Sequence, residues 1–394
     1  MLTAYRGNRA GLFIRKTVLP AIAGLLFLSA LAADTAQAQG AQQPASQPKL
    51  PIEGTNGQWL VEGTERQADA RVAEFQGRSA LWLKNNSHVM QAGTEEFVDG
   101  TIEFDVAPME RGDFIAIVFR RESPQNHENI YLRPFSSGLF EALQYAPRIN
   151  GSASWQLYPE FNAAVDLPRN QWTHLRLEIK GSSLTVYVNN AAKPALSVAR
   201  LRGIPAKGPV GFWARANNDP KTWAAALSNV TIRPAASADK IATARPAPAV
   251  GTITAWEVAA PVKAEAGAVT RLPQLSGWRQ AEVEESGLVN LNRVLGRHNG
   301  RGTAFARTTI KAEQAHTLSL EIGYSDDVTV FVNGEPVYAG LNGWESRHPG
   351  YLGFVKTGYE TVHLRLRQGD NEIILAVTDD QRFGWGFAAR TVSP

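Results

Sequence analysis

Hydrophobic and polar residues alternate along much of the chain, and this period of two predicts β-strands. Leu175, Leu177 and Ile179 alternate with charged residues, and the alternation resumes over 184–188 after the small-residue turn at 181–183. Successive side chains of a strand point to opposite faces of a sheet, so the segment predicts a hairpin with one buried face.

Further strands are expected on either side of this hairpin. Residues 102–106 alternate in the same way, 114–119 is almost wholly apolar, and 224–232 supplies a closing strand. No stretch shows the pattern of an amphipathic helix of three turns. Many short strands between Gly, Pro and Asn turns are typical of a sandwich or jelly roll.

The second half repeats the pattern with other residues. Alternating strands are expected over 318–322, 328–332, 362–366 and 373–377, and the pair Asn333-Gly334 directly follows the second of them. An Asn-Gly pair favours a tight hairpin turn, because both turn positions need a positive φ.

Two stretches without such a pattern divide the chain. Residues 39–51 are rich in Gln, Ala, Pro and Ser, and 234–250 are rich in Pro and Ala, so neither has the apolar residues for a core. We therefore expect a disordered tether at 39–51 and a linker at 234–250. The predicted fold class is all-β, with two β-sandwich (jelly-roll) domains in tandem at 52–233 and 251–394.

The N-terminus has the order of segments found in secretory signal peptides. Basic residues up to Lys16 precede an apolar run at 18–33 and the small-residue site Ala36-Gln37-Ala38. A membrane anchor is the alternative, but the run is short for a span of about 20 residues. The sequence predicts a cleaved signal peptide at 1–38, a periplasmic or secreted protein, and no membrane insertion after cleavage.

The composition excludes several kinds of site and partner. The chain has no cysteine, which excludes disulfides and thiolate metal sites, and its formal net charge of +3 gives no basic footprint for nucleic acid. We expect no nucleic-acid partner and no cofactor. Asp326 and Asp327 could contribute to a structural calcium site, but two adjacent acids supply too few oxygen ligands to support one.

The first patterned region resembles a known superfamily. Over about 57–233, the runs DGTIEFDVAP, FIAIVFRRES and QWTHLRLEIKGSSLTVYVNN are similar to concanavalin A-like lectin/glucanase domains, nearest to bacterial laminin-G-like and 3-keto-disaccharide-hydrolase-like domains. The resemblance implies the fold, and it is compatible with lectins, glycosidases and inert spacers.

The second region resembles a galactose-binding-like jelly roll. Over 251–394 the similarity lies in the runs ITAWEVAAPV, VTVFVNGEPVYAG, LRLRQGDNEIILAV and FGWGFAAR. Such domains often accompany sugar-processing modules, so the resemblance implies a domain that either binds glycan or supports its neighbour.

A dense mixture of aromatic, guanidinium and amide side chains lies between residues 126 and 158. Aromatic rings cover the apolar face of a sugar while planar polar groups bind its hydroxyls, so this stretch is the preferred glycan site. The expected ligand-binding residues are Tyr131, Arg133, Gln144, Tyr145, Asn150, Trp155 and Tyr158. The alternative interpretation is that the aromatic residues pack under loops and that Arg133 forms only a structural ion pair.

The second domain offers a smaller set of candidates near its predicted loop tips. These residues are Asn342, Trp344, Arg347 and Trp385, although a Trp within the run GWG is more often a core residue. We identify no metal-binding residues.

Three function classes remain open. The leading hypothesis is an exported carbohydrate-binding protein that recognises glycan in its first domain, with the second as an accessory or support module. The first alternative is a glycoside hydrolase or 3-keto-disaccharide hydrolase-like enzyme, with Glu128 or Glu141 as acid or base. The second is a non-catalytic structural module of the envelope. An enzyme predicts two carboxylates that converge in one pocket, whereas a lectin predicts exposed aromatic rings beside Arg and Asn.

Overall fold

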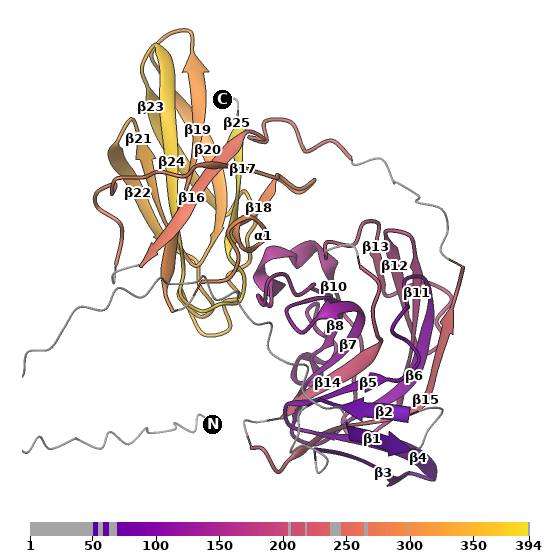
Figure 1. The fold of residues 1–394 in the computed structure, drawn as a ribbon. Coiled ribbons are helices and arrows are strands. Elements are labelled where there is room, and N and C mark those ends of the chain that lie inside the picture. Colours follow the sequence, from indigo (N-terminus) through magenta and orange to yellow (C-terminus); the bar gives the residue numbers. More distant parts are fainter. Residues whose placement is uncertain are drawn as a thin grey trace, which may run out of the picture. The chain divides into compact units, whose positions relative to one another are not determined.

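The computed structural model describes residues 50–53, 58–62, 69–203, 206–216, 219–236, 246–263, 267–298 and 300–392. The predicted signal peptide, most of the tether and the middle of the linker lie outside these residues. Within them the fold is all-β, as the sequence predicts, and its antiparallel strands form four sheets (Figure 1). No helix in the described part of the chain is long and apolar enough to cross a membrane.

The first sandwich pairs an eight-stranded sheet with a seven-stranded one. In spatial order, the eight strands are β1 (Leu50–Glu53), β2 (Gln58–Val61), β5 (Ser87–Gln91), β14 (Gly211–Ala216), β7 (Gly112–Ser123), β8 (Asn126–Leu132), β9 (Leu143–Tyr145) and β10 (Asn162–Ala163). The seven are β13 (Leu196–Val198), β12 (Ser183–Val188), β11 (Thr173–Lys180), β6 (Gly100–Pro108), β15 (Trp223–Pro234), β4 (Arg78–Lys84) and β3 (Ala70–Phe75).

The second sandwich pairs a six-stranded sheet with a four-stranded one. The six strands are β17 (Arg279–Ala281), β16 (Trp256–Lys263), β19 (Gly302–Ala312), β24 (Gly369–Asp379), β21 (Asp327–Val332) and β22 (Glu335–Leu341). The four are β18 (Leu288–Asn290), β25 (Gly386–Val392), β20 (His316–Ser325) and β23 (Glu360–Leu366). One short α-helix, α1 (Leu291–Leu295), and the 3₁₀ turns η2 (Pro134–Ser136), η3 (Trp155–Leu157) and η4 (Pro159–Phe161) complete the described helices.

Both hairpins that the sequence predicts are present. β11 pairs with β12 through Leu177 and Val186, and the apolar residues of both strands enter the core. β21 and β22 are joined at Asn333 and Gly334, whose φ angles of 52° and 88° match the tight turn that this pair favours.

Each sandwich buries its own core, and the first core includes residues of the second sandwich. Leu288, Val355 and Ala388 pack in the same hydrophobic cluster as the inner faces of the first two sheets. The two sandwiches belong to one compact unit. We call this contact between the two sandwiches the seam. Side chains in the seam are therefore held by both sandwiches.

Candidate functional site

One row of side chains crosses the eight-stranded sheet on its outer face, which points away from the core. Strand pairing places Trp213 beside His88 on one side and Ala116 on the other, and Ala116 beside Tyr131. Gln144 follows next to Tyr131 on β9. The alternating residues Ile115, Ile117 and Ile130 fill the core, so the row itself faces outward. We call His88, Trp213, Ala116, Tyr131 and Gln144 the outer-face row.

The aromatic members of the row are in contact with one another. The ring centroids of Tyr131 and Trp213 lie 6.4 Å apart, edge to face, and those of His88 and Trp213 lie 5.8 Å apart. Phe114 and Phe135 continue the series, because Phe114 lies 6.5 Å from Trp213 and 5.3 Å from Phe135. Trp213 and Phe114 are half-buried and Phe135 is exposed, so this face offers ring surface to solvent.

Arg133 lies just past the end of β8, between two aromatic rings. Its guanidinium carbon is 5.7 Å from the ring centroid of Tyr131 and 5.7 Å from that of Trp155. Nη1 donates to the carbonyl of Glu141 at 2.8 Å, and Nη2 donates to Oε1 of Gln144 at 2.5 Å. Arg133 is buried, and it forms no ion pair within the described residues. Burial lowers the pKa of Arg133 to about 10, because the attraction of Tyr131 and Glu141 offsets only part of the lost hydration.

Gln144 fixes the position of Trp155. Its amide nitrogen donates to the carbonyls of Trp155, at 2.8 Å, and Tyr158, at 3.3 Å, while its oxygen accepts from Arg133. These bonds hold η3 beside the outer-face row through the backbone. Four of the predicted ligand residues, Tyr131, Arg133, Gln144 and Trp155, therefore lie together.

Trp155 also contacts aromatic residues of the second sandwich. Its ring centroid lies 5.8 Å from that of Phe354 and 5.4 Å from that of Phe383, and Phe383 in turn lies 6.1 Å from Trp344. Trp344 is 40% exposed. We call Trp155, Phe354, Phe383 and Trp344 the seam aromatics. No local sequence pattern indicates Phe354, because its packing against Trp155 depends on contacts between residues some 200 positions apart.

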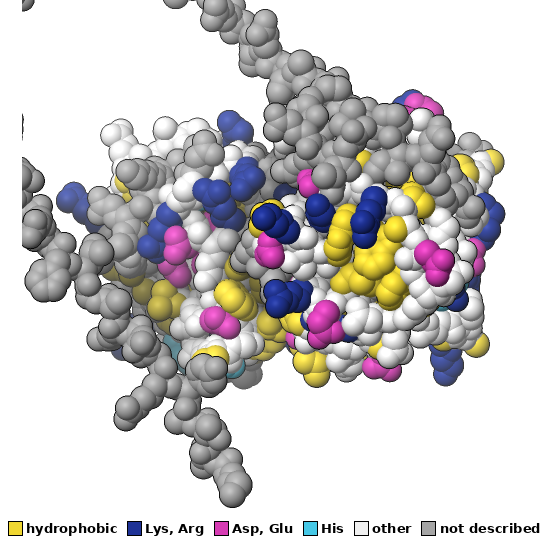
Figure 2. All heavy atoms as spheres, turned by 90° about the horizontal axis from the view of Figure 1, so that it is seen from below, with side chains coloured by type: hydrophobic (Ala, Val, Ile, Leu, Met, Phe, Trp, Pro, Cys, Tyr) yellow, Lys and Arg dark blue, Asp and Glu magenta, His cyan; other side chains and the backbone are white. Residues whose placement is uncertain are grey.

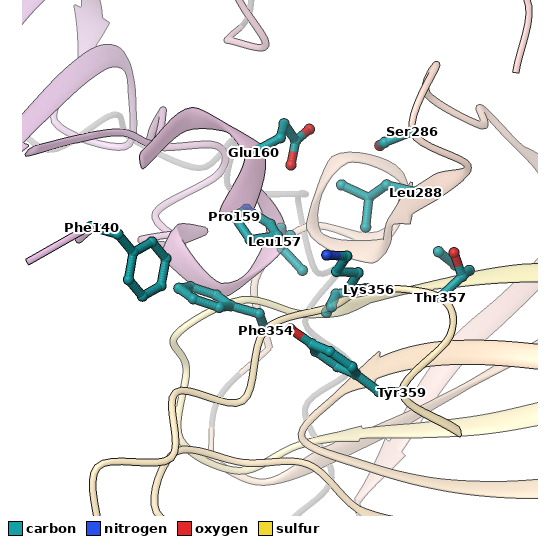
Figure 3. Close-up of a pocket in the computed structure, with 12 residues that line it drawn as sticks. Phe140, Leu157, Pro159, Glu160, Ser286, Leu288, Phe354, Lys356, Thr357 and Tyr359 are labelled. Carbon is teal, nitrogen blue, oxygen red and sulfur yellow. The ribbon is translucent and has the colours of Figure 1, made fainter. Parts of the chain in front are cut away.

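A pocket of about 340 Å³ adjoins the seam aromatics (Figure 3). Phe354 belongs to both, and its ring also contacts Phe140 on the rim at 6.0 Å. Much of the lining is apolar, but Glu160 and Lys356 supply a carboxylate and an ammonium group. Figure 3 shows Glu160 and Ser286 at one end of the pocket and Tyr359 at the other. No local sequence pattern indicates these residues, because the pocket forms only where the two sandwiches meet.

Tyr145 and Glu128 lie on the other side of the sheet. β9 pairs with β8 so that Tyr145 stands opposite Ile130, which puts its side chain on the core face rather than beside Tyr131. Tyr145, one of the expected ligand-binding residues, therefore lies on the opposite face of the sheet from Tyr131. The hydroxyl of Tyr145 donates to Oε2 of Glu128 at 2.7 Å, and both residues are buried. Burial raises the pKa of Glu128 to about 7.

Tyr158 lies in the buried seam between the sandwiches. It has no exposed surface, its hydroxyl donates to Oε1 of Glu284 at 3.0 Å, and it accepts from the amide of Asn290 at 3.2 Å. Arg293 is 3.5 Å from the same carboxylate oxygen of Glu284. Tyr158 is therefore part of a polar network that joins the sandwiches.

Glu141 and Asn150 have local partners. Oε1 of Glu141 accepts from Ser136 at 3.1 Å, and the amide of Asn150 donates to the carbonyl of Asn292 in the second sandwich at 2.8 Å. The two carboxylates named for the enzyme alternative, Glu128 and Glu141, thus bond to different partners, one inside the core and one in a loop.

The second-domain candidates differ in exposure. Asn342 is buried and donates to the carbonyl of Tyr324 at 2.6 Å, and Trp385 is fully buried, with its indole N–H donating to Val377 at 3.1 Å. Arg347 forms an ion pair of 2.5 Å with Glu360. Of these four candidates, Trp344 is the one with a partly exposed aromatic ring, and this ring contacts Phe383.

The adjacent acids Asp326 and Asp327 also have partners. Asp326 accepts from the backbone N–H groups of Asp380, at 2.8 Å, and Gln381, at 2.7 Å, and Asp327 pairs with Arg301 at 2.6 Å. Within the described ranges, no group of three or more His, Cys, Asp or Glu side chains could hold a metal ion.

Neither a protein-family model nor a curated protein matches this chain. Several solved structures are similar to 46% of it. One is the carbohydrate binding module CBM66 from Bacillus subtilis, with 15% identity, 99% of that chain covered and a TM-score of 0.33. Another is a Bacillus subtilis protein of unknown function with a galectin-like fold, with 15% identity, 90% covered and a TM-score of 0.31. A third is domain 4 of AbnA, an extracellular GH43 arabinanase from Geobacillus stearothermophilus in complex with arabinotriose, with 16% identity, 84% covered and a TM-score of 0.30.

Proposed function

We propose that this protein is an exported carbohydrate-binding protein whose glycan lies along the outer-face row and crosses the seam aromatics. The observation that carries the proposal is Arg133, a buried guanidinium held between the rings of Tyr131 and Trp155 without a carboxylate partner. A guanidinium presents its donors in one plane, and rings beside that plane can cover the C–H face of a sugar.

The seam aromatics extend this surface onto the second sandwich. A chain stacked on Trp155 would meet Phe383 and then Trp344, whose exposed ring would give the second sandwich a direct part in binding. The adjoining pocket is at the lower end of the range for ligand sites, about 300–1,000 Å³. Its apolar lining with a few polar groups suits the end of a glycan chain.

Binding is favoured over hydrolysis by the carboxylates at the site. Glycosidases generally place two carboxyl groups on either side of the scissile bond. Glu160 is the only carboxylate among the residues that line the pocket, and Glu128 is enclosed in the core with Tyr145.

A glycan array on the mature protein, followed by calorimetry with its strongest binder, tests the proposal. Trp155→Ala and Arg133→Gln should each weaken binding about five-fold to a hundred-fold, since ring stacking and charged hydrogen bonds contribute on the order of 1–3 kcal/mol. Gln144 holds Trp155 through its backbone carbonyl, so the loop should stay in place without the ring.

Tyr187→Ala is the matched control, because it removes a half-buried ring from β12 on the other sheet. Circular dichroism on all three variants checks the fold. Unchanged affinity in folded Trp155→Ala and Arg133→Gln proteins would contradict the proposed site, and the absence of any glycan binder would contradict the function.

A further inference from the structure

A second aromatic surface covers the outer face of the seven-stranded sheet, on the opposite side of the first sandwich from the outer-face row. Its floor consists of Ala80, Ala107 and Ala226, which lie on the adjacent strands β4, β6 and β15. These small residues are fully buried although they face away from the core, because four half-buried aromatic side chains cover them. The four are Phe75, Trp82, Trp172 and Trp223. We call them the back-face aromatics.

The back-face aromatics form one connected cluster. Trp82 lies 5.9 Å from Trp223 and 5.3 Å from Phe75, and Phe75 lies 5.4 Å from Trp172, all edge to face. Figure 2 views the molecule from the side where Figure 1 draws β3 and β4, and there hydrophobic side chains lie next to Lys and Arg side chains. Packing against the alanines explains why the rings are there, but the rings remain partly exposed.

Three cations stand over these rings. Arg71 and Lys84 lie over the same ring, that of Trp223, at 4.6 and 5.1 Å from its centroid, and Arg78 lies 5.2 Å from Trp172. Arg78 is neutralised by an ion pair of 2.7 Å with Asp105. Arg71 and Lys84 form no ion pair with any described residue. Two like charges near one indole repel each other, and an anionic group that pairs with either of them would relieve that repulsion.

We propose that the back-face aromatics, with Arg71 and Lys84, bind an acidic polysaccharide whose sugar rings carry carboxylates. The indoles would take the apolar faces of the sugars while the two free cations pair with uronate groups. Two cations on a protein of formal net charge +3 are too few for a nucleic acid or an anionic membrane, each of which binds through many phosphate contacts. This site is separate from the proposed glycan site around Arg133. The proposal for the back-face aromatics therefore does not depend on the function proposed for Arg133.

Polygalacturonate is the probe, with a neutral galactan as its uncharged counterpart. Titration of the full chain, followed by tryptophan fluorescence, should show binding of polygalacturonate that weakens as NaCl rises, because exposed charges are screened. The double variant Arg71→Gln/Lys84→Gln should lose about tenfold or more in affinity, while Arg71→Lys/Lys84→Arg, which keeps both charges, should retain most of it.

Lys311→Gln/Arg365→Gln is the matched control, since it removes two exposed cations from the second sandwich. It should change the affinity less than twofold. No binding of polygalacturonate to the wild type, or equal losses in the control and the double variant, would overturn the proposal. Tighter binding to phosphatidylglycerol vesicles or single-stranded DNA through the same two cations would also overturn it.

Discussion

The hydroxyl of Tyr158, in the first sandwich, donates a hydrogen bond of 3.0 Å to the carboxylate of Glu284, in the second. Both side chains are buried, and Arg293 and Arg202 lie within 3.5 Å of the same carboxylate. Arg202 belongs to the first sandwich and also pairs with Glu285 of the second. These charged contacts fix how the two sandwiches pack at the seam, because each contact forms only when the side chains of both sandwiches are correctly placed.

This relationship predicts that Tyr158→Phe destabilises the protein. The variant keeps the ring but leaves a buried carboxylate oxygen with one donor fewer, which costs about 1–3 kcal/mol of unfolding free energy. Urea denaturation measures the loss. Tyr187→Phe, which removes a hydroxyl without a hydrogen bond to any described residue, should leave the stability unchanged. Equal stability of the Tyr158→Phe variant and wild type would show that the bond contributes nothing.

Glu128 predicts a pH dependence of stability. Burial raises its pKa from 4.5 to about 7, so the folded protein retains a proton that the unfolded chain releases between these values. Stability contributed by this group is therefore lost as pH rises through that window, by roughly 3 kcal/mol at most.

Glu128→Gln should remove this dependence. The amide oxygen can still accept from Tyr145, so the variant should match wild type near pH 5 and exceed it at pH 8. Urea denaturation at both pH values measures the difference. Glu122→Gln, at an exposed position of the neighbouring strand, is the control and should follow wild type. A Glu128→Gln protein that loses stability between pH 5 and 8 as wild type does would refute the assignment.

The alternation of apolar and polar residues predicted the strands well, because a strand that buries one face needs an apolar residue at every second position. It placed Leu175, Leu177 and Ile179 in the core, and Asn333-Gly334 at a turn, from neighbours in sequence alone. It could not predict that Tyr145 faces the core, because this depends on the register between β8 and β9. Arg133 and Trp155 were found as residue types suited to sugars. Their contacts with Phe354 and Phe383 depend on the seam, which no local pattern encodes.

The pocket gives a further prediction. Ser286 is exposed and lines it, so Ser286→Trp should fill part of the space with an indole and weaken glycan binding if the chain end enters there. We expect a loss of about tenfold, measured by calorimetry with the strongest array binder. Thr317→Trp adds the same ring at an exposed site on β20 and should have no effect. Unchanged affinity for Ser286→Trp would confine the site to the outer-face row and the seam aromatics.

Trp344 decides whether the second sandwich takes part in binding. Its backbone is held by Gln381, which accepts from its N–H at 2.6 Å and donates to its carbonyl at 2.9 Å, so Trp344→Ala should remove the ring and leave the loop in place. Because an aromatic contact contributes about 0.5–1.5 kcal/mol, affinity for glycan should fall about two- to tenfold. Val337→Ala, at a residue 45% exposed on β22, is the control for loss of apolar surface.

Short and long oligosaccharides of the same glycan sharpen the test of Trp344. A chain that reaches from Trp155 past Phe383 should lose affinity in Trp344→Ala, whereas a disaccharide held at Arg133 should not. Equal losses for both lengths would mean that Trp344 acts by supporting Phe383 and Trp155 rather than by touching the glycan.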